Sequence, residues 1–155
     1  MSKKSRVDVI CEAYSMLSYY AERGQWTKSL SHTVTKNIKK LTDIELMEMV
    51  SRKHNLFEFV PNPSRELSLF ACKCVPYLIQ MCHFDDDFLL TLLTSSDSGH
   101  RVINFIRDKD LKRVKMSRLS DDVQILAVTQ SPECISYIAD PCDQAKVIAA
   151  LSTAR

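Results

Sequence analysis

The chain has 155 residues, of which 45% are hydrophobic and 26% charged, and its formal net charge at pH 7 is +2. A chain of this length can bury roughly 70% of its unfolded surface in one core, so we expect one domain that needs no disulfide. The nearly balanced charge excludes the strongly basic composition typical of nucleic-acid-binding domains, and the presence of only two glycines disfavours phosphate-binding loops and β-hairpins.

The cysteines and the apolar stretches indicate the cellular compartment. We expect the six cysteines to be reduced, because most of them lie among apolar residues within expected helices. The first residues are basic but lead into an amphipathic segment, without the apolar core of a secretory signal. The longest uncharged apolar stretch, residues 74–84, is too short to span a bilayer. Together these features predict a soluble, cytoplasmic protein without a membrane anchor.

The first 60 residues predict three helices. Apolar residues at three- and four-residue spacing predict a helix from Val7 onward, and Gly24 suits the left-handed conformation that follows a helix C-terminus. A second helix is expected over 30–41, and Thr42-Asp-Ile-Glu45 has the form of a capping box that opens a third. We expect 55–62 to be a connector. The apolar face expected for the first helix consists of Val9, Ala13, Met16, Leu17, Tyr20 and Ala21.

The rest of the chain is organised as a repeat. A turn or cap residue, a polar pair and apolar residues at helical spacing recur in four stretches, at 63–72, 84–93, 119–128 and 141–150. A shorter second helix follows in each of three copies, and the spacing between corresponding apolar residues of the two helices is twelve residues (67 to 79 and 123 to 135) or fifteen (88 to 103). The three second helices, 77–82, 101–106 and 133–138, carry apolar residues at their second, third, fifth and sixth positions. The last copy lacks its second helix.

These patterns predict an all-α fold. We expect a single domain over residues 1–155, in which 1–60 form an N-terminal three-helix bundle and 61–155 form helical hairpins stacked into a short, curved, α-solenoid-like array. The truncated last copy would cap the array. Alternatively, a second copy of the chain would complete it as a homodimer and bury Val147, Ile148 and Leu151.

The units resemble short tandem helical repeats of uncharacterised function, built on an Asp-x-x-Val-x-x-x-Ala-Val-type first helix, in large bacteriophage and some protist proteins. The resemblance covers 63–151 and is clearest at 120–128 and 141–151. It implies an α-helical array of phage or other mobile-element origin, in the bacterial host cytoplasm, and it carries no catalytic residue with it. A small phage-encoded protein of this sort would be an inhibitor or modulator of a host defence or transcription component.

Two basic segments and two aromatic residues are candidate binding elements. Residues 107–118 interrupt the repeat with six Lys or Arg against two Asp, and they form either a phosphate- or acid-binding helix or a solvated linker, which is the more frequent case. Residues 36–40 offer a second basic face. The candidate binding residues are Lys109, Lys112, Arg113, Lys115, Arg118, Lys36, Lys39, Lys40, Tyr19 and Trp26.

No pattern in the chain predicts a metal, a cofactor or catalysis. Cys72 and Cys74 point about 200° apart on a helix and cannot ligate one ion together, so we expect them and Cys82 to be core residues. The three aspartates at 85–87 are explained by a helix N-terminus. His100 lies in a loop but has no partner in sequence that would form a catalytic pair.

Helical arrays usually serve recognition, so we expect a non-catalytic protein that binds another protein. The alternative is a nucleic-acid-binding protein that uses the faces at 107–118 and 36–40. Binding to phosphates should weaken steeply with salt, whereas an apolar interface should respond little.

Overall fold

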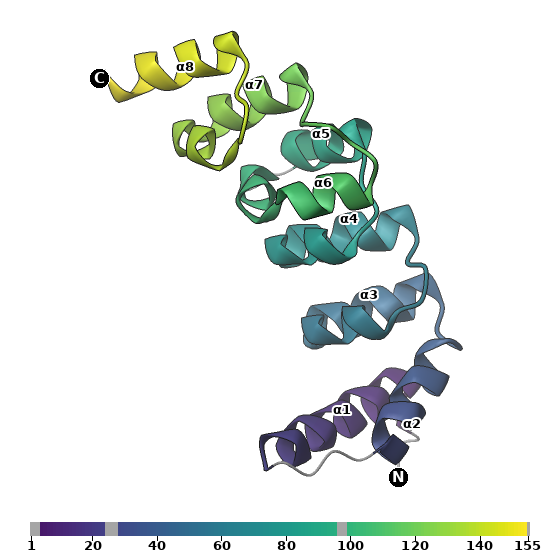
Figure 1. The fold of residues 1–155 in the computed structure, drawn as a ribbon. Helices are drawn as coiled ribbons and strands as arrows, with labels where there is room; N and C mark the ends of the chain where they lie inside the picture. Colours follow the sequence, from purple (N-terminus) through teal and green to yellow (C-terminus); the bar gives the residue numbers. More distant parts are fainter. Residues whose placement is uncertain (1–3, 24–27, 96–98, 155) are drawn as a thin grey trace. The chain divides into compact units, whose positions relative to one another are not determined.

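The computed structural model describes residues 4–23, 28–95 and 99–154, and within these ranges helices, joined by turns and irregular segments, are the only regular secondary structure (Figure 1). The predicted all-α class is therefore confirmed. None of the described helices is both long and apolar enough to cross a membrane. Candidate residue Trp26 lies outside the described residues. The α-helices are α1 (Arg6–Glu22), α2 (Lys28–Ile38), α3 (Asp43–Arg52), α4 (Arg65–Cys74), α5 (Asp86–Ser95), α6 (Asp108–Arg113), α7 (Asp121–Gln130) and α8 (Asp143–Thr153), and the 3-10 helices are η1 (His54–Phe59), η2 (Pro76–Met81), η3 (Gly99–Phe105) and η4 (Pro132–Tyr137).

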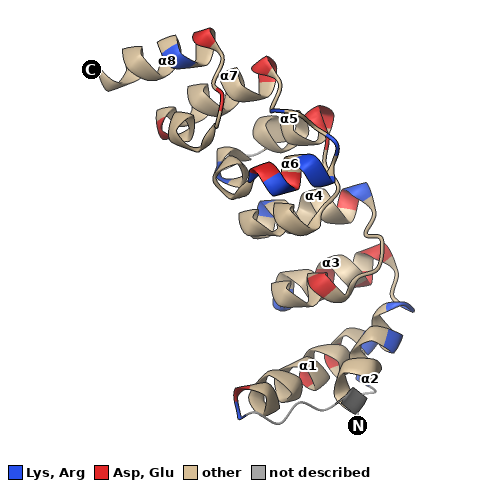
Figure 2. Ribbon diagram, in the orientation of Figure 1, with Lys and Arg blue, Asp and Glu red and all other residues tan. Residues whose placement is uncertain are grey.

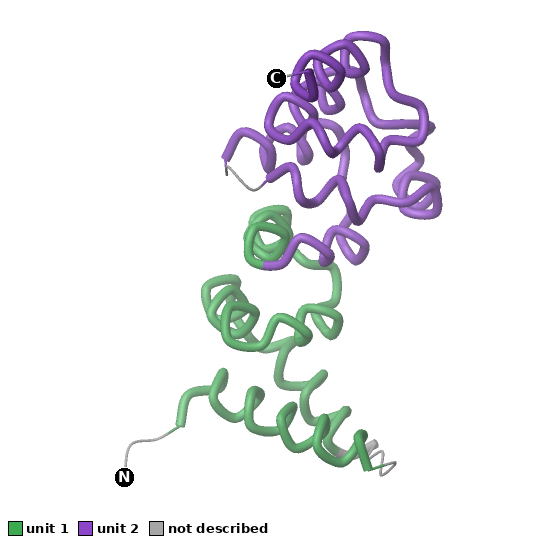
Figure 3. The backbone as a smooth tube through the Cα atoms, turned by 90° about the vertical axis from the view of Figure 1, so that its left-hand side faces the viewer, with its two compact units in different colours: residues 1–74 green, residues 75–155 purple. Residues whose placement is uncertain are grey.

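The chain divides into two compact units, residues 1–74 and 75–155 (Figure 3). Unit 1 holds α1 to α4 with η1, and unit 2 holds η2 to α8. The division falls between α4 and η2 rather than at the border near residue 60 suggested by the sequence pattern. The expectation of a single domain stays a prediction.

In unit 1, α1 packs against α2 and α3. The face it buries differs from the predicted one, because Val9 and Met16 are exposed and Tyr20 is only half-buried. Helix α1 carries apolar side chains on more than one side, so spacing alone did not identify the side that meets its neighbours. The buried residues of α1 are Val7, Ile10, Cys11 and Leu17.

Capping boxes open both α1 and α3. The Thr42 hydroxyl accepts a hydrogen bond from the backbone N–H of Glu45, and the Glu45 carboxylate accepts one from the backbone N–H of Thr42, as the sequence predicts. Ser5 and Asp8 form the same box at α1, and Arg52 Nη1 lies 3.0 Å from Asp8 Oδ1, which ties α3 to the start of α1. These contacts fix how the first and third helices meet.

Each α-helix from α3 to α7 is followed by a 3-10 helix, except the inserted α6. The second helices of the predicted hairpins are therefore 3-10 rather than α. The repeat also begins earlier than predicted, because the expected connector at 55–62 contains η1, and 55–60 carry the same apolar pattern as the later copies. Pro76 and Pro132 open two of these segments, where a proline cannot continue the preceding α-helix.

In unit 2 the repeats stack on their neighbours. Helix α5 packs on α7 and α7 on α8, while η2 packs on η3 and η3 on η4. The fully buried Gln124 fastens the last two copies, because its Nε2 donates to the Leu119 carbonyl (2.8 Å) and its Oε1 accepts from the backbone N–H of Cys142 (2.7 Å). At Gly99 a Cβ would lie 2.3 Å from the Leu92 carbonyl oxygen, so only glycine permits this close approach.

Candidate binding surface

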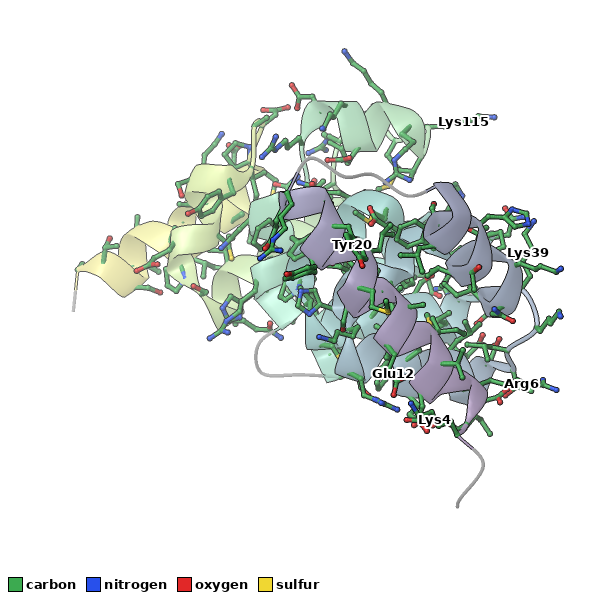
Figure 4. All side chains as sticks on the ribbon, turned by 90° about the horizontal axis from the view of Figure 1, so that it is seen from below. Lys4, Arg6, Glu12, Tyr20, Lys39 and Lys115 are labelled. Carbon is green, nitrogen blue, oxygen red and sulfur yellow. The ribbon has the colours of Figure 1, made fainter. Side chains whose placement is uncertain are left out.

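The basic insertion at 107–118 folds as α6 and a left-handed turn. Val114 is buried and Leu111 half-buried, whereas Lys112 and Lys115 are exposed. The Lys115 side chain, in the turn that follows α6, extends away from that helix (Figure 4). Lys115 has φ 61°, and the backbone N–H of Met116 donates to the Leu111 carbonyl (2.9 Å), as in helix C-terminal motifs where glycine is usual.

Arg113 and Arg118 are engaged within unit 2. Arg113 Nη1 donates to the Cys82 carbonyl (2.7 Å) and Nη2 to the Ile79 carbonyl (3.5 Å), and the guanidinium lies 5.9 Å from the centre of the Phe84 ring. Arg113 thus satisfies carbonyls at the end of η2 and fastens α6 to it. Arg118 forms an exposed ion pair with Asp121 at 3.0 Å.

The insertion keeps three free lysines. Lys109, Lys112 and Lys115 are exposed and form no ion pair within the described part of the chain. Figure 2 shows acidic and basic residues interleaved along α6, with basic residues toward its C-terminal end. The candidate basic surface of unit 2 is therefore smaller than the sequence suggests.

Unit 1 carries a separate basic group. Lys36, Lys39 and Lys40 are exposed at the end of α2, and Arg6 Nη1 donates to the Lys40 carbonyl (3.3 Å). The side chains of Arg6 and Lys39 both point outward (Figure 4). Lysine at a helix C-terminus is also favoured by the helix dipole, so this group has a local explanation.

Tyr19 is exposed, as expected for a contact residue, but its ring is already occupied on one side. The guanidinium of Arg23 lies 4.1 Å from the ring centre, in cation–π geometry, and the Tyr20 ring meets it edge-on at 5.6 Å. Part of the contact area that Tyr19 could offer a partner is therefore covered by its own helix.

The cysteines and aspartates that resemble metal ligands have other surroundings. Cys72 and Cys82 are buried as expected, but Cys74 is exposed, so its assignment to the core was wrong. Asp85 caps α5 through the backbone N–H of Phe88 (2.7 Å). In the described residues, no three Cys, His, Asp or Glu side chains converge into a metal site.

His100 lies beside Cys134, whose thiol contacts the His100 backbone. A pocket of about 460 Å³ is lined by His100, Asn104, Glu133 and Cys134 among others. The Cys134 thiol is buried and contacts the His100 carbonyl (3.7 Å) and Asn104 Oδ1 (4.0 Å), and burial raises its pKa. A nucleophilic cysteine needs a lowered thiol pKa, so Cys134 resembles a buried structural thiol.

One surface was missed by the sequence reading: a row of exposed apolar residues at the ends of the 3-10 helices. In unit 2 these residues are Met81, Phe105 and Tyr137, with exposed fractions of 46%, 36% and 52%. They occupy the fifth position of the repeated pattern, whose second and sixth positions are buried in every copy. We call these three residues the 3-10 ridge.

Internal contacts hold the 3-10 ridge together. The rings of Tyr77 and Phe105 meet edge-on at 6.4 Å, and Gln80 Nε2 donates to the Phe105 carbonyl (2.9 Å). Because η2 packs on η3 and η3 on η4, the ridge residues belong to neighbouring segments of one face. The sequence pattern does show that the fifth position is apolar in each copy. It does not show that this position is exposed.

Comparison with known proteins found no matching family model, and no match among curated proteins or solved structures.

Proposed function

We propose that this chain is a non-catalytic helical-repeat protein that binds another protein, and that unit 2 does so through the 3-10 ridge. The observation that carries the proposal is the repeated exposure of Met81, Phe105 and Tyr137 at equivalent positions. Methionine and aromatic side chains are enriched in protein interfaces, and repeat arrays commonly bind partners along a surface that successive units share. The partner class we would test first is a host protein, because the repeats resemble those of phage proteins.

The test compares the wild-type chain with a ridge variant as bait in a bacterial lysate treated with nuclease. The variant replaces Met81, Phe105 and Tyr137 with serine. Phe105 is only 36% exposed and packs edge-on against Tyr77, so its substitution should cost about 0.5–1.5 kcal/mol of stability, and circular dichroism checks that the variant is folded. We expect a protein that is retained by the wild type and lost from the ridge variant. For the purified pair, Phe105→Ser alone should weaken binding roughly 30-fold, or about 2 kcal/mol.

The matched control is a variant with Lys109, Lys112 and Lys115 changed to alanine, which leaves the ridge intact. Equal retention of every partner by the wild type and the ridge variant would contradict the proposal. The three free lysines favour nucleic acid as the second candidate. Loss of all bound material on nuclease treatment, together with loss in the lysine variant and a steep salt dependence, would move that function to first place.

A further inference from the structure

The C-terminal end of unit 2 contains an apolar groove of about 500 Å³ between η4 and α8. Pro132, Ile135 and Tyr137 line it from η4, and Ala149, Ala150 and Thr153 line it from α8. The groove is distinct from the 3-10 ridge, although Tyr137 belongs to both.

Comparison with the earlier copies shows why the groove is open. The third position of the 3-10 pattern is buried at Phe57, Ile79 and Ile103, with exposed fractions of 2%, 0% and 0%, but at Ile135 it is half-exposed. An apolar side chain that three copies bury fully is thus only partly buried in the last one.

The same holds on the α-helical side. The residue eight positions after the helix cap is buried in α5 (Leu93) and α7 (Val128), but its counterpart in α8, Ala150, is exposed. Both uncovered positions line the groove. The groove therefore consists of surface that the next unit of the array would cover.

The packing rule inside unit 2 defines what fits there. Helix η3 packs on the α-helix that precedes it, α5, and on its neighbours η2 and η4, and η4 packs in the same way on α7 and η3. A further 3-10 segment would by this rule pack on α8 and on η4. These are the two elements that form the groove.

Helix α8 carries a charged residue at the position where a further α-helix would pack on it. Four residues after the helix cap, Leu89 in α5 and Gln124 in α7 are fully buried, whereas α8 has Lys146, which is exposed and pairs with Asp143 at 3.1 Å. Burying this lysine under another helix would cost its hydration. Helix α8 thus presents a charged residue at this position, while the 3-10 side of the same copy is apolar.

We propose that this groove binds a short 3-10 segment of a partner protein, with apolar residues at the second, third and sixth positions of the pattern that the chain itself uses. The contacts would repeat those between η3 and η4, so the chain itself shows the expected binding geometry. The groove shares only Tyr137 with the 3-10 ridge, so substitutions at Ala150 and at Phe105 test the two sites separately.

The probe is a synthetic peptide with the sequence of residues 99–106, labelled with a fluorophore, which contains the pattern and no cysteine. We expect saturable binding to the full chain by fluorescence polarisation. Ala150→Glu places a charge in the groove and should weaken binding at least tenfold. Gln144→Glu, an exposed residue of α8 outside the lining, adds the same charge and should leave binding within about twofold.

A second pair of controls separates this site from the ridge. A peptide with aspartate in place of Val102 and Ile103 should not bind, and Phe105→Ser in the full chain should not affect the parent peptide. Absence of saturable binding, or equal binding by Ala150→Glu, would overturn the proposal. If Phe105→Ser abolished peptide binding and Ala150→Glu did not, the peptide would bind at the ridge. If the chain dimerised with rising concentration in sedimentation and Ala150→Glu abolished this, the occupant of the groove would be a second copy of the chain.

Discussion

Arg113 shows how a single side chain in a basic segment can serve the fold. Its guanidinium donates to two carbonyls at the end of η2, at 2.7 and 3.5 Å, so Arg113→Ala removes both donors at once. Because the residue lies at the surface, water replaces part of the loss, and we expect destabilisation of about 1–2 kcal/mol in urea unfolding. Arg113→Lys should be intermediate, since lysine lacks the planar fork that reaches two acceptors.

The neighbouring Lys112 is the matched control for this prediction. It is exposed and its side chain makes no hydrogen bond or ion pair within the described part of the chain, so Lys112→Ala should change stability by less than about 0.5 kcal/mol. Equal effects of the two alanine variants would show that Arg113 has no special role. The sequence shows that 107–118 is rich in basic residues. It does not show the role of Arg113, because the carbonyls that this residue binds lie 31 and 34 positions earlier in the chain.

At the scale of elements, the helix caps were predictable and the packing faces were not. Thr42 and Glu45 form the capping box expected from their spacing, because a capping box depends only on residues three apart. The prediction of the buried face of α1 was wrong, because the packing of α2 and α3 decides which of its apolar sides is buried. The copy formed by α3 and η1 was not predicted, because 55–62 was expected to be a connector although 55–60 carry the apolar pattern of the later 3-10 segments.

The capping box at α1 predicts acid sensitivity. Hydrogen bonds from Ser5, and then from Arg52, lower the pKa of Asp8 below its usual value. A carboxyl group with a lowered folded pKa stabilises the fold fully above its usual pKa of about 3.9, and this contribution is lost as the pH falls through the lowered pKa. We therefore expect the free energy of unfolding to begin to fall as the pH approaches that usual value from above and to keep falling through the lowered pKa, with a shallower fall in Asp8→Asn.

Urea unfolding followed by circular dichroism across this pH range measures the slope. Glu22→Gln is the control, because Glu22 lies on the same helix and has no ion pair among the residues that the structure describes. That variant should keep the wild-type slope. An unchanged slope in Asp8→Asn would mean that the box at α1 does not contribute to the folded state's acid sensitivity.

At the scale of the whole molecule, repeat architecture predicts that stability is local. In an array of this type each repeat gains stability mainly from the repeats next to it, so a destabilising substitution should loosen only the helices near it. The chain offers two matched sites for the test: Val34 in α2 of unit 1 and Val123 in α7 of unit 2 are both fully buried. Substituting alanine removes the same two methyl groups at each, at a cost of about 2 kcal/mol.

Hydrogen exchange measured by mass spectrometry locates the effect. Val34→Ala should raise exchange in α1, α2 and η1, which contact one another, and Val123→Ala should raise it in α7, η4 and α8. Each variant should leave the other region near its wild-type rate. If both variants raised exchange uniformly from α1 to α8, the chain would unfold as one cooperative block, and the single domain expected from its length would describe its stability better than its two compact units do.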